Sequence, residues 1–173
     1  MAKSLLDKLT GGDRRSIGRA DEVTTMVLKR PALFTELMTG LYDADPLVCM
    51  RAADAAEKVS LQKPELLLPF HARLLRLLDE TTQQEVRWHM AQMVSRLPLS
   101  SKERLRAASA LRRYLEDPSS IVKTCALEAL AAIATNDKSL QPEVKALLQK
   151  AIKSGTAAMK ARSRKLLRRF EVR

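Results

Sequence analysis

Aromatic residues, glycines and histidines are scarce in this chain of 173 residues, and each shortage excludes a class of function. The aromatic residues (Phe 3, Tyr 2, Trp 1) are too few for nucleic-acid modules that stack bases on rings. The 5 glycines form no phosphate loop and no Gly-x-Ser-x-Gly elbow. His71 and His89 make no metal-ligand spacing with a cysteine or a carboxylate. The sequence therefore predicts no cofactor and no metal, and it favours a noncatalytic protein.

Long apolar segments and a cysteine-rich framework are missing as well. No stretch approaches the roughly 20 apolar residues of a membrane-spanning helix, and Asp7 and Lys8 interrupt the leucines of the opening segment. Cys49 and Cys125 each lie in an alanine-rich helical context, which favours reduced core thiols over a disulfide or a reactive cysteine. We therefore expect a cytoplasmic protein without a transmembrane segment.

The positive charge of the chain is concentrated at one end. The formal net charge is +11, from 31 Lys and Arg against 20 Asp and Glu. Residues 1–99 carry 14 basic and 13 acidic side chains, residues 100–144 carry 7 and 6, and residues 145–173 carry 10 and 1. An anionic partner is therefore expected only for the C-terminal part of the chain.

Apolar residues recur at three- and four-residue steps, as in Leu33, Leu37 and Leu41, and no segment alternates with period two. Because 46% of the residues are hydrophobic, the chain can also bury a core. The sequence therefore predicts an all-α fold.

Four predicted helices, which we call the B helices, share one apolar pattern. They start at Val48, Val86, Val122 and Met159, at steps of 38, 36 and 37 residues. In each, the residues at the start and 4, 8 and 11 positions later form one stripe of apolar or small side chains. A further helix is predicted before each, at about residues 31–43, 64–79, 101–116 and 141–153. Each hairpin cannot bury its own stripe, so neighbouring hairpins must stack.

An Asp-Pro pair, followed by valine and by a small residue four positions after that valine, marks the joint before two B helices. At such a joint the Asp can cap the next helix or close a turn. The residues are Asp45, Pro46, Val48 and Ala52, and Asp117, Pro118, Val122 and Ala126. With a basic residue after the apolar start, at Arg87, Lys123 and Lys160, the motif resembles HEAT repeats and their armadillo-like relatives over residues 31–170. Cys49 departs from this basic position.

The resemblance implies a short right-handed α-α superhelix of about four HEAT-like helical hairpins, whose B helices line the concave face. The tetratricopeptide repeat is the main rival by length, but its Trp, Leu-Gly and Tyr pattern is missing. Scaffolds of this type host many roles, so the resemblance is more specific for fold than for function.

Residues 1–20 fit the repeat pattern less well than residues 21–173. The stretch TGGDRRSIGRA has three glycines and mixed charge, which predicts a flexible linker after a short first helix. A helix near residues 21–30, with Val23, Val27 and Leu28 facing inward, is expected to cap the first repeat. The alternative is an ordered arm that docks elsewhere. We therefore expect an N-terminal helix and linker at 1–20 and a HEAT-like repeat domain at 21–173.

The only tryptophan, Trp88, lies off the apolar stripe. On a concave face it can anchor a protein partner, because a large rigid ring gains contact area for little entropy lost. The alternative is packing between repeats. The row six positions after each start changes sign along the stack, which suits a mixed-charge peptide groove; it consists of Asp54, Gln92, Glu128 and Lys165. The candidate concave-face binding residues are Arg87, Trp88, His89, Arg96, Lys123 and Glu128.

The last predicted hairpin is strongly basic. Its cations can bind several phosphates or an anionic headgroup layer. The alternative is a solvated cap, because a terminal repeat needs a polar outer face. The candidate polyanion-binding residues are Lys153, Lys160, Arg162, Arg164, Lys165, Arg168 and Arg169.

The sequence therefore leaves three candidate functions. The first is a noncatalytic scaffold that binds a protein partner along its concave face, and the second is nucleic-acid or other polyanion binding through the basic C-terminal repeat. The third follows from the resemblance, because HEAT-like folds include bacterial alkylpurine DNA glycosylases. Those enzymes hold the lesion with several aromatic residues and a carboxylate, and Trp88 with Asp54 or Glu128 is a poor match.

Overall fold

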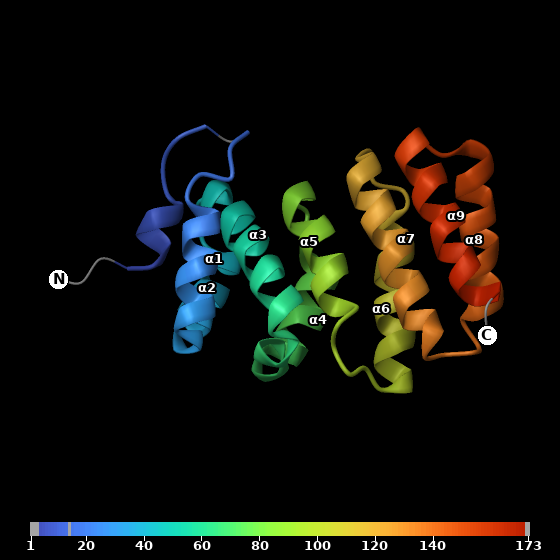
Figure 1. The fold of residues 1–173 in the computed structure, drawn as a ribbon, viewed down its shortest axis with the longest axis horizontal. Helices are drawn as coiled ribbons and strands as arrows, with labels where there is room; N and C mark the ends of the chain where they lie inside the picture. The colour runs from blue at the N-terminus through green and yellow to red at the C-terminus, as the bar shows by residue number, and fades with distance from the viewer. Residues whose placement is uncertain (1–3, 14, 172–173) are drawn as a thin grey trace.

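Every regular element in the part of the chain that the structure describes, residues 4–13 and 15–171, is a helix in this computed structural model (Figure 1). This confirms the all-α prediction. Among these residues, no helix is both long and apolar enough to cross a membrane. In chain order the 3₁₀ helices (η) and α-helices are η1 (Leu6–Leu9), α1 (Ala20–Lys29), η2 (Pro31–Leu33), α2 (Phe34–Thr39), η3 (Gly40–Tyr42), α3 (Pro46–Gln62), η4 (Pro64–Phe70), α4 (His71–Glu80), α5 (Gln84–Val94), α6 (Ser101–Tyr114), α7 (Ser120–Thr135), α8 (Gln141–Ser154) and α9 (Ala157–Glu171).

The helices form two layers. Helices α1, α3, α5, α7 and α9 lie side by side, each in contact with the next, and we call them the B row (Figure 1). Helices α2, α4, α6 and α8 each pack against the B-row helix that follows in the chain, and we call them the A layer. The first and last described helices, η1 and α9, therefore lie at opposite ends of the molecule (Figure 1).

The apolar stripe predicted for the B helices is buried between the two layers. In the units of α3, α5 and α7, every member of the stripe is less than a tenth exposed. In α9, Met159, Leu167 and Phe170 are only half-buried, because no further helix among the described residues packs beside this one. The position four residues after each start is 0% exposed throughout; it holds Ala52, Met90, Ala126 and Ser163.

The predicted helix at residues 31–43 is broken into three pieces. Pro31 begins η2, α2 follows, and η3 begins at Gly40. A Cβ atom on Gly40 would lie 2.8 Å from the Cβ of Ala52 and 2.8 Å from Cδ2 of Leu6, so glycine permits this close approach to α3 and η1. The helix predicted at residues 64–79 begins as the 3₁₀ helix η4, which contains Pro69, and continues as α4.

The two Asp-Pro joints are built differently. Asp45 caps α3, because its side chain accepts a 2.9 Å hydrogen bond from the N–H of Leu47. Asp117 instead closes the turn before α7 and accepts a 2.8 Å hydrogen bond from the N–H of Ser119. Ser119 then caps α7 by accepting from the N–H of Val122. Both roles predicted for Asp at such a joint are therefore used.

The N-terminal segment packs against the B row. Its first helix is η1, and Val23 and Val27 of α1 are 0% exposed, as predicted. Residues 10–13 and 15–19 then form a loop whose main-chain carbonyls accept hydrogen bonds from Arg51 of α3. The buried guanidinium needs these carbonyls as hydrogen-bond partners, and the contacts join the loop to α3.

Candidate functional site

Polar side chains of the B row meet at equivalent positions in successive helices. The side chain three positions after the start of one B helix lies against the one six positions after the start of the preceding helix. The pairs are His89 Nε2 with Asp54 Oδ1 at 3.9 Å, Gln92 Nε2 with Cys125 Sγ at 3.7 Å, and Arg162 Nη1 with Glu128 Oε1 at 2.9 Å. Three members of the mixed-charge row, Asp54, Gln92 and Glu128, therefore contact the next B helix.

Two of the predicted binding residues, Arg87 and Arg96, are engaged inside the stack. Arg96 donates to the carboxylate of Glu57 on α3. Arg87 Nη1 lies 2.6 Å from Oδ2 of Asp117, and its guanidinium covers the ring of Tyr114 at 5.4 Å from the centroid. Their charges are compensated by carboxylate partners in the neighbouring unit.

Trp88 borders a cleft of about 400 Å³ between the N-terminal loop, α3 and α5. Its ring is half-buried and packs edge-on against the ring of His89, with centroids 5.6 Å apart. Trp88 therefore packs between helices and also borders a cavity. We call this cavity the Trp88 cleft, and it is lined by Arg15, Ser16, Ile17, Met50, Arg51, Asp54, Glu85, Trp88 and His89.

His89 lines the Trp88 cleft and is only 8% exposed. Burial disfavours the imidazolium and lowers the pKa of His89 from 6.5 to about 4, so the ring is neutral at pH 7. Its Nδ1 atom is buried and has no hydrogen-bond partner among the described side chains and main chain. His89 is buried because two helices and the N-terminal loop converge over this ring.

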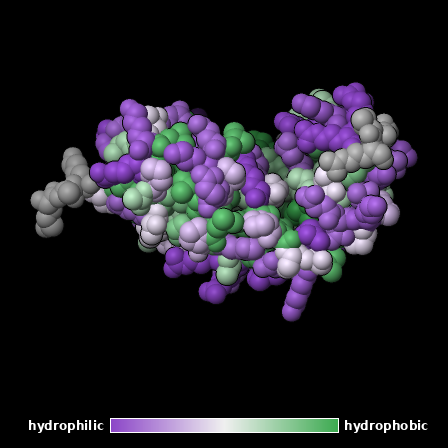
Figure 2. Space-filling model, turned by 60° about the horizontal axis from the view of Figure 1, so that its bottom comes forward, coloured by the Kyte–Doolittle hydropathy of each residue, from purple (hydrophilic) through white to green (hydrophobic). Residues whose placement is uncertain are grey.

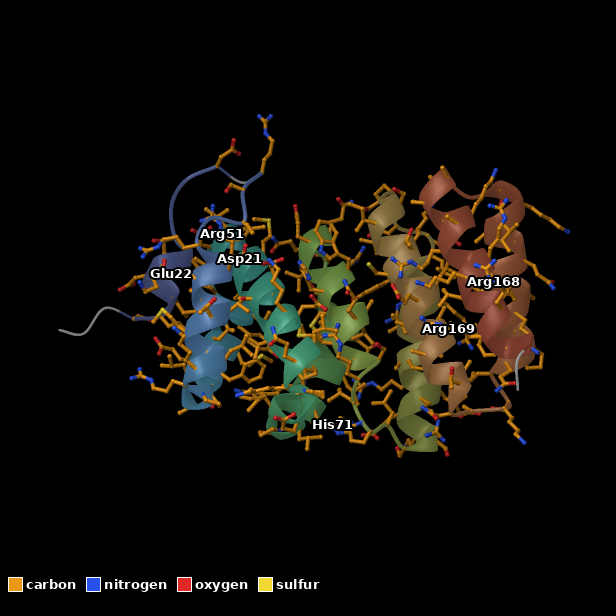
Figure 3. All side chains as sticks on the ribbon, in the orientation of Figure 1. Asp21, Glu22, Arg51, His71, Arg168 and Arg169 are labelled. Atoms are coloured by element: carbon orange, nitrogen blue, oxygen red, sulfur yellow. The ribbon has the colours of Figure 1, made fainter. Side chains whose placement is uncertain are left out.

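Arg51, three positions after Val48, closes the N-terminal end of this face. It is 1% exposed, and its guanidinium lies under the N-terminal loop (Figure 3). The nearby Gly18 has φ +55, and a Cβ there would lie 2.7 Å from Cζ of Arg51. The guanidinium donates to the carbonyl oxygens of Leu9 at 2.8 Å, Thr10 at 3.4 Å, Gly11 at 2.6 Å, Asp13 at 3.2 Å and Ser16 at 3.1 Å. The hydrogen bonds of Arg51 therefore hold the N-terminal loop, which forms one wall of the Trp88 cleft.

The remaining predicted concave-face residues lie elsewhere. Lys123 is half-buried and lines, with Lys150, a second cleft of about 340 Å³ between α7, α8 and the start of α9. Glu128 is paired with Arg162. Of the six predicted residues, the structure brings only Trp88 and His89 together in the Trp88 cleft.

The basic end differs from the rest of the B row because most of its cations face solvent. Hydrophilic side chains cover the end that carries α8 and α9 (Figure 2), and Arg168 and Arg169 project from α9 (Figure 3). Lys160 is half-buried, and Arg162 is the predicted cation that is paired with a carboxylate of the described residues. The exposed members of this set without a carboxylate partner among the described residues are Lys153, Arg164, Lys165, Arg168 and Arg169.

Arg169 shows why cations at the basic end lack carboxylate partners. It lies ten positions after the start of its B helix, as Arg96 does. Arg96 meets Glu57 of the preceding helix, but the equivalent residue beside Arg169 is Ala131. The register that pairs an arginine in the middle of the stack therefore provides no carboxylate at its end.

Sequence reasoning missed Arg51 and Glu85 as lining residues of the Trp88 cleft. An arginine within an alanine-rich helix was a usable signal, since such a charge needs partners when the helix is buried. Within residues 4–13 and 15–171, no group of three or more His, Cys, Asp or Glu side chains is placed to hold a metal ion. Comparison of the chain with models of known protein families and with curated proteins gives no match.

Proposed function

We propose that the protein is a noncatalytic scaffold, a short right-handed superhelix of about four HEAT-like hairpins, that binds a protein partner along the B row. The observation that carries this proposal is the Trp88 cleft, where a half-buried aromatic ring borders a cavity near the middle of the row. A rigid ring beside polar and charged groups is the usual composition of an interface anchor. We place this role in the cytoplasm, as the sequence predicts.

The paired charges in the middle of the B row favour a protein over a polyanion as the partner of this part of the face. Arg87, Arg96 and Lys58 each have a carboxylate partner in the stack, at Asp117, Glu57 and Asp54 respectively. The middle of the B row therefore offers little unpaired positive charge to a polyanion. A mixed surface of this kind fits the polar rim around an aromatic anchor in protein interfaces.

Site-specific photo-crosslinking in the cells of origin tests the proposal. A photoreactive amino acid is placed at Thr124 or Ala161 on the B row, and at Leu68 of η4 or Leu105 of α6, away from the B row, as matched controls. We expect one crosslinked protein of the same mass from the B-row positions and none from the A layer. Crosslinks from Leu68 and Leu105 alone, or none from any position, would contradict binding along the B row.

A second candidate function is polyanion binding through the basic end. It is favoured by one observation: Arg164, Lys165, Arg168 and Arg169 are exposed on one helix and have no ion-pair partner among the described side chains. Adjacent cations without partners can release counterions from several phosphates. A solvated cap needs charge but does not need one sign of charge, so the excess of cations supports this function.

Binding to duplex DNA and single-stranded RNA over a salt series tests the second candidate. Replacing Lys165, Arg168 and Arg169 together with Glu removes up to three phosphate contacts and should lower the salt slope on duplex DNA by about 2–3. Replacing Arg73, Arg76 and Lys102 with Glu changes the net charge equally on exposed A-layer positions and should leave most of the affinity. Equal effects of the two triple variants would reject a site on α9.

A further inference from the structure

We propose that the second cleft, which lies between α7, α8 and the start of α9, binds a carboxylate joined to an aromatic ring. We call it the Lys123 cleft, and its volume is about 340 Å³. Such a ligand site goes beyond the proposed function, because it does not require a partner on the B row. Its ligand is identified by comparing two successive joints of the repeat, the one before α7 and the one before α9.

At the joint before α7, the chain itself places an aromatic ring and a carboxylate against a cation of the preceding B helix. The ring is that of Tyr114 and the carboxylate is that of Asp117, and both residues are buried. The guanidinium of Arg87 covers the Tyr114 ring at 5.4 Å from the centroid, and its Nη1 atom lies 2.6 Å from Oδ2 of Asp117. The cation, the ring and the carboxylate therefore form one cluster.

The joint before α9 keeps the cation but not its partners. Lys123 of α7 lies at the register of Arg87, one position after the start of its B helix. It is half-buried, and it makes no hydrogen bond or ion pair through its side chain with any described residue. Arg87 and Arg96 are half-buried as well, but each has a carboxylate partner. A cation that is partly removed from water without a counterion favours the binding of an anion.

Two smaller residues stand where the ring and the carboxylate would be. Tyr114 and Asp117 lie 8 and 5 positions before the start of the stripe in α7. At the same distances before the start of the stripe in α9, the chain has Ala151 and Ser154. Both of these residues line the Lys123 cleft. Alanine lacks the ring and serine lacks the carboxylate, so the cleft offers a ligand the space of both groups beside Lys123.

The other walls of the Lys123 cleft suit the same ligand. Leu127, Leu147 and Met159 provide apolar surface for a ring. Lys150 adds a second cation that has no carboxylate partner among the described residues. The acidic residue of the lining is Glu116, which is exposed and makes no ion pair with either lysine. Two lysines against one carboxylate leave the lining positive, which selects an anion.

Binding can be followed in the cleft itself, because Met159 lines it. In protein labelled with ¹³C at the methionine methyl groups, the Met159 signal is assigned through Met159→Leu. The probe is 3-phenylpropanoate, and the matched controls are 3-phenylpropanamide, which lacks the charge, and acetate, which lacks the ring. We expect a saturable shift of the Met159 signal with the probe, and about tenfold weaker binding of each control.

N-acetylphenylalanine distinguishes two sources of this chemistry. It carries the ring and the carboxylate as the last residue of a peptide does, whereas 3-phenylpropanoate represents a free acid. Tighter binding of N-acetylphenylalanine would assign the cleft to the aromatic C-terminal residue of a protein, a group that proteins are known to capture through its carboxylate. Tighter binding of 3-phenylpropanoate would assign it to a small aryl acid.

Variants separate the cleft from general electrostatic attraction. Ser154→Asp restores a carboxylate at the register of Asp117 and should weaken the probe about fivefold, because it competes for Lys123. Gln149→Glu adds the same charge at an exposed position of α8 outside the lining and should leave most of the affinity. Lys123→Met should weaken the probe about tenfold, and its control is Lys153→Met, also exposed on α8.

Thermal unfolding of each variant checks that the fold is retained. Equal effects within either pair of variants would overturn the assignment of the ligand to Lys123. Equal binding of the probe and its amide would remove recognition of the carboxylate, and equal binding of acetate would remove recognition of the ring. Tighter binding of inorganic phosphate would assign the two lysines to a phosphate group instead.

None of these results affects the crosslinking test, because crosslinks from Thr124 and Ala161 do not require an aryl acid in the Lys123 cleft. Failure of the ligand site is therefore distinguishable from failure of the proposed function.

Discussion

Two helices of the B row carry an arginine at the same register but place it in opposite environments. Arg51 and Arg162 each lie three positions after the start of their B helix, in α3 and α9. Arg51 is 1% exposed and donates to five carbonyl oxygens of the N-terminal loop. The side chain of Arg162 is 44% exposed, and Glu128 is its carboxylate partner.

The difference shows that register alone does not decide what a charged side chain does. At the N-terminal end a loop covers the helix, so the charge of Arg51 becomes part of the fold. At the C-terminal end, α9 packs against α7 and α8 but no described loop covers its exposed arginines, Arg168 and Arg169. The same repeat geometry therefore buries the charge of Arg51 in one region and leaves Arg168 and Arg169 exposed in the other.

Replacing each arginine with methionine is the most severe test of this comparison. Arg51→Met keeps much of the apolar stem but leaves buried carbonyls of the loop without a donor, which should lower the free energy of unfolding by about 3–5 kcal/mol. Arg162→Met breaks an exposed ion pair and should lower it by less than about 1 kcal/mol. Urea denaturation measures both. Similar losses in the two variants would show that Arg51 does not hold the loop.

The pH dependence of stability should also separate the ends, because only the Trp88 cleft buries a histidine whose pKa is strongly lowered. Folded His89 has a pKa of about 4 against 6.5 when exposed, so below pH 6.5 the unfolded chain takes up a proton that the folded chain refuses. Stability should therefore fall by about 2 kcal/mol between pH 7 and pH 5.

His89→Gln is the comparison that isolates this effect, since it should flatten the stability profile between pH 7 and pH 5. Hydrogen bonds from Ser139 and Arg104 lower the pKa of Asp137 below 3.8, so its stabilisation is lost only at more acidic pH. An unchanged profile in His89→Gln would contradict a neutral, buried imidazole.

Glycine substitutions test how closely the N-terminal loop packs against Arg51. Gly18 has φ +55, and a Cβ there would lie 2.7 Å from Cζ of Arg51, whereas Gly11 has φ +70 and nothing within 4 Å of an added Cβ. Gly11→Ala should lose about 1 kcal/mol from backbone strain alone. Gly18→Ala should lose about 1 kcal/mol more, because it also displaces the guanidinium. Equal losses in thermal or urea unfolding would mean that the loop moves away from Arg51 without cost.

Much of the fold was predictable because helical periodicity is local. The stripe with Ala52, Met90 and Ala126 follows from spacing within single segments, and the structure buries all three. The pair of Arg96 with Glu57 was also within reach, because its separation of 39 residues is close to the repeat length. A cation in one repeat and a carboxylate one repeat earlier predict such a contact.

The Arg51 contacts were not predictable in the same way. Their acceptors are main-chain carbonyls, which every residue carries, so no side-chain pattern identifies them. The burial of His89 depends on the same loop, because Ser16 and Ile17 help to enclose the Trp88 cleft. The part of the candidate site that sequence reasoning missed is therefore the part built by backbone from outside the repeats.

The smallest expected effect concerns a polar side chain within the C-terminal stripe. Ser163 is 0% exposed and its Oγ has no hydrogen-bond partner among the described atoms, whereas the equivalent residue in α3 is Ala52. Ser163→Ala removes a buried hydroxyl without a partner and should raise the free energy of unfolding by up to about 1 kcal/mol. Ser60→Ala is the matched control, because its buried Oγ accepts from Arg96 at 2.8 Å and should lose a similar amount. Destabilisation by Ser163→Ala would mean that this hydroxyl has a hydrogen-bond partner in solution. The C-terminal end of the stripe would then bury a hydrogen-bonded polar group, as the N-terminal loop does.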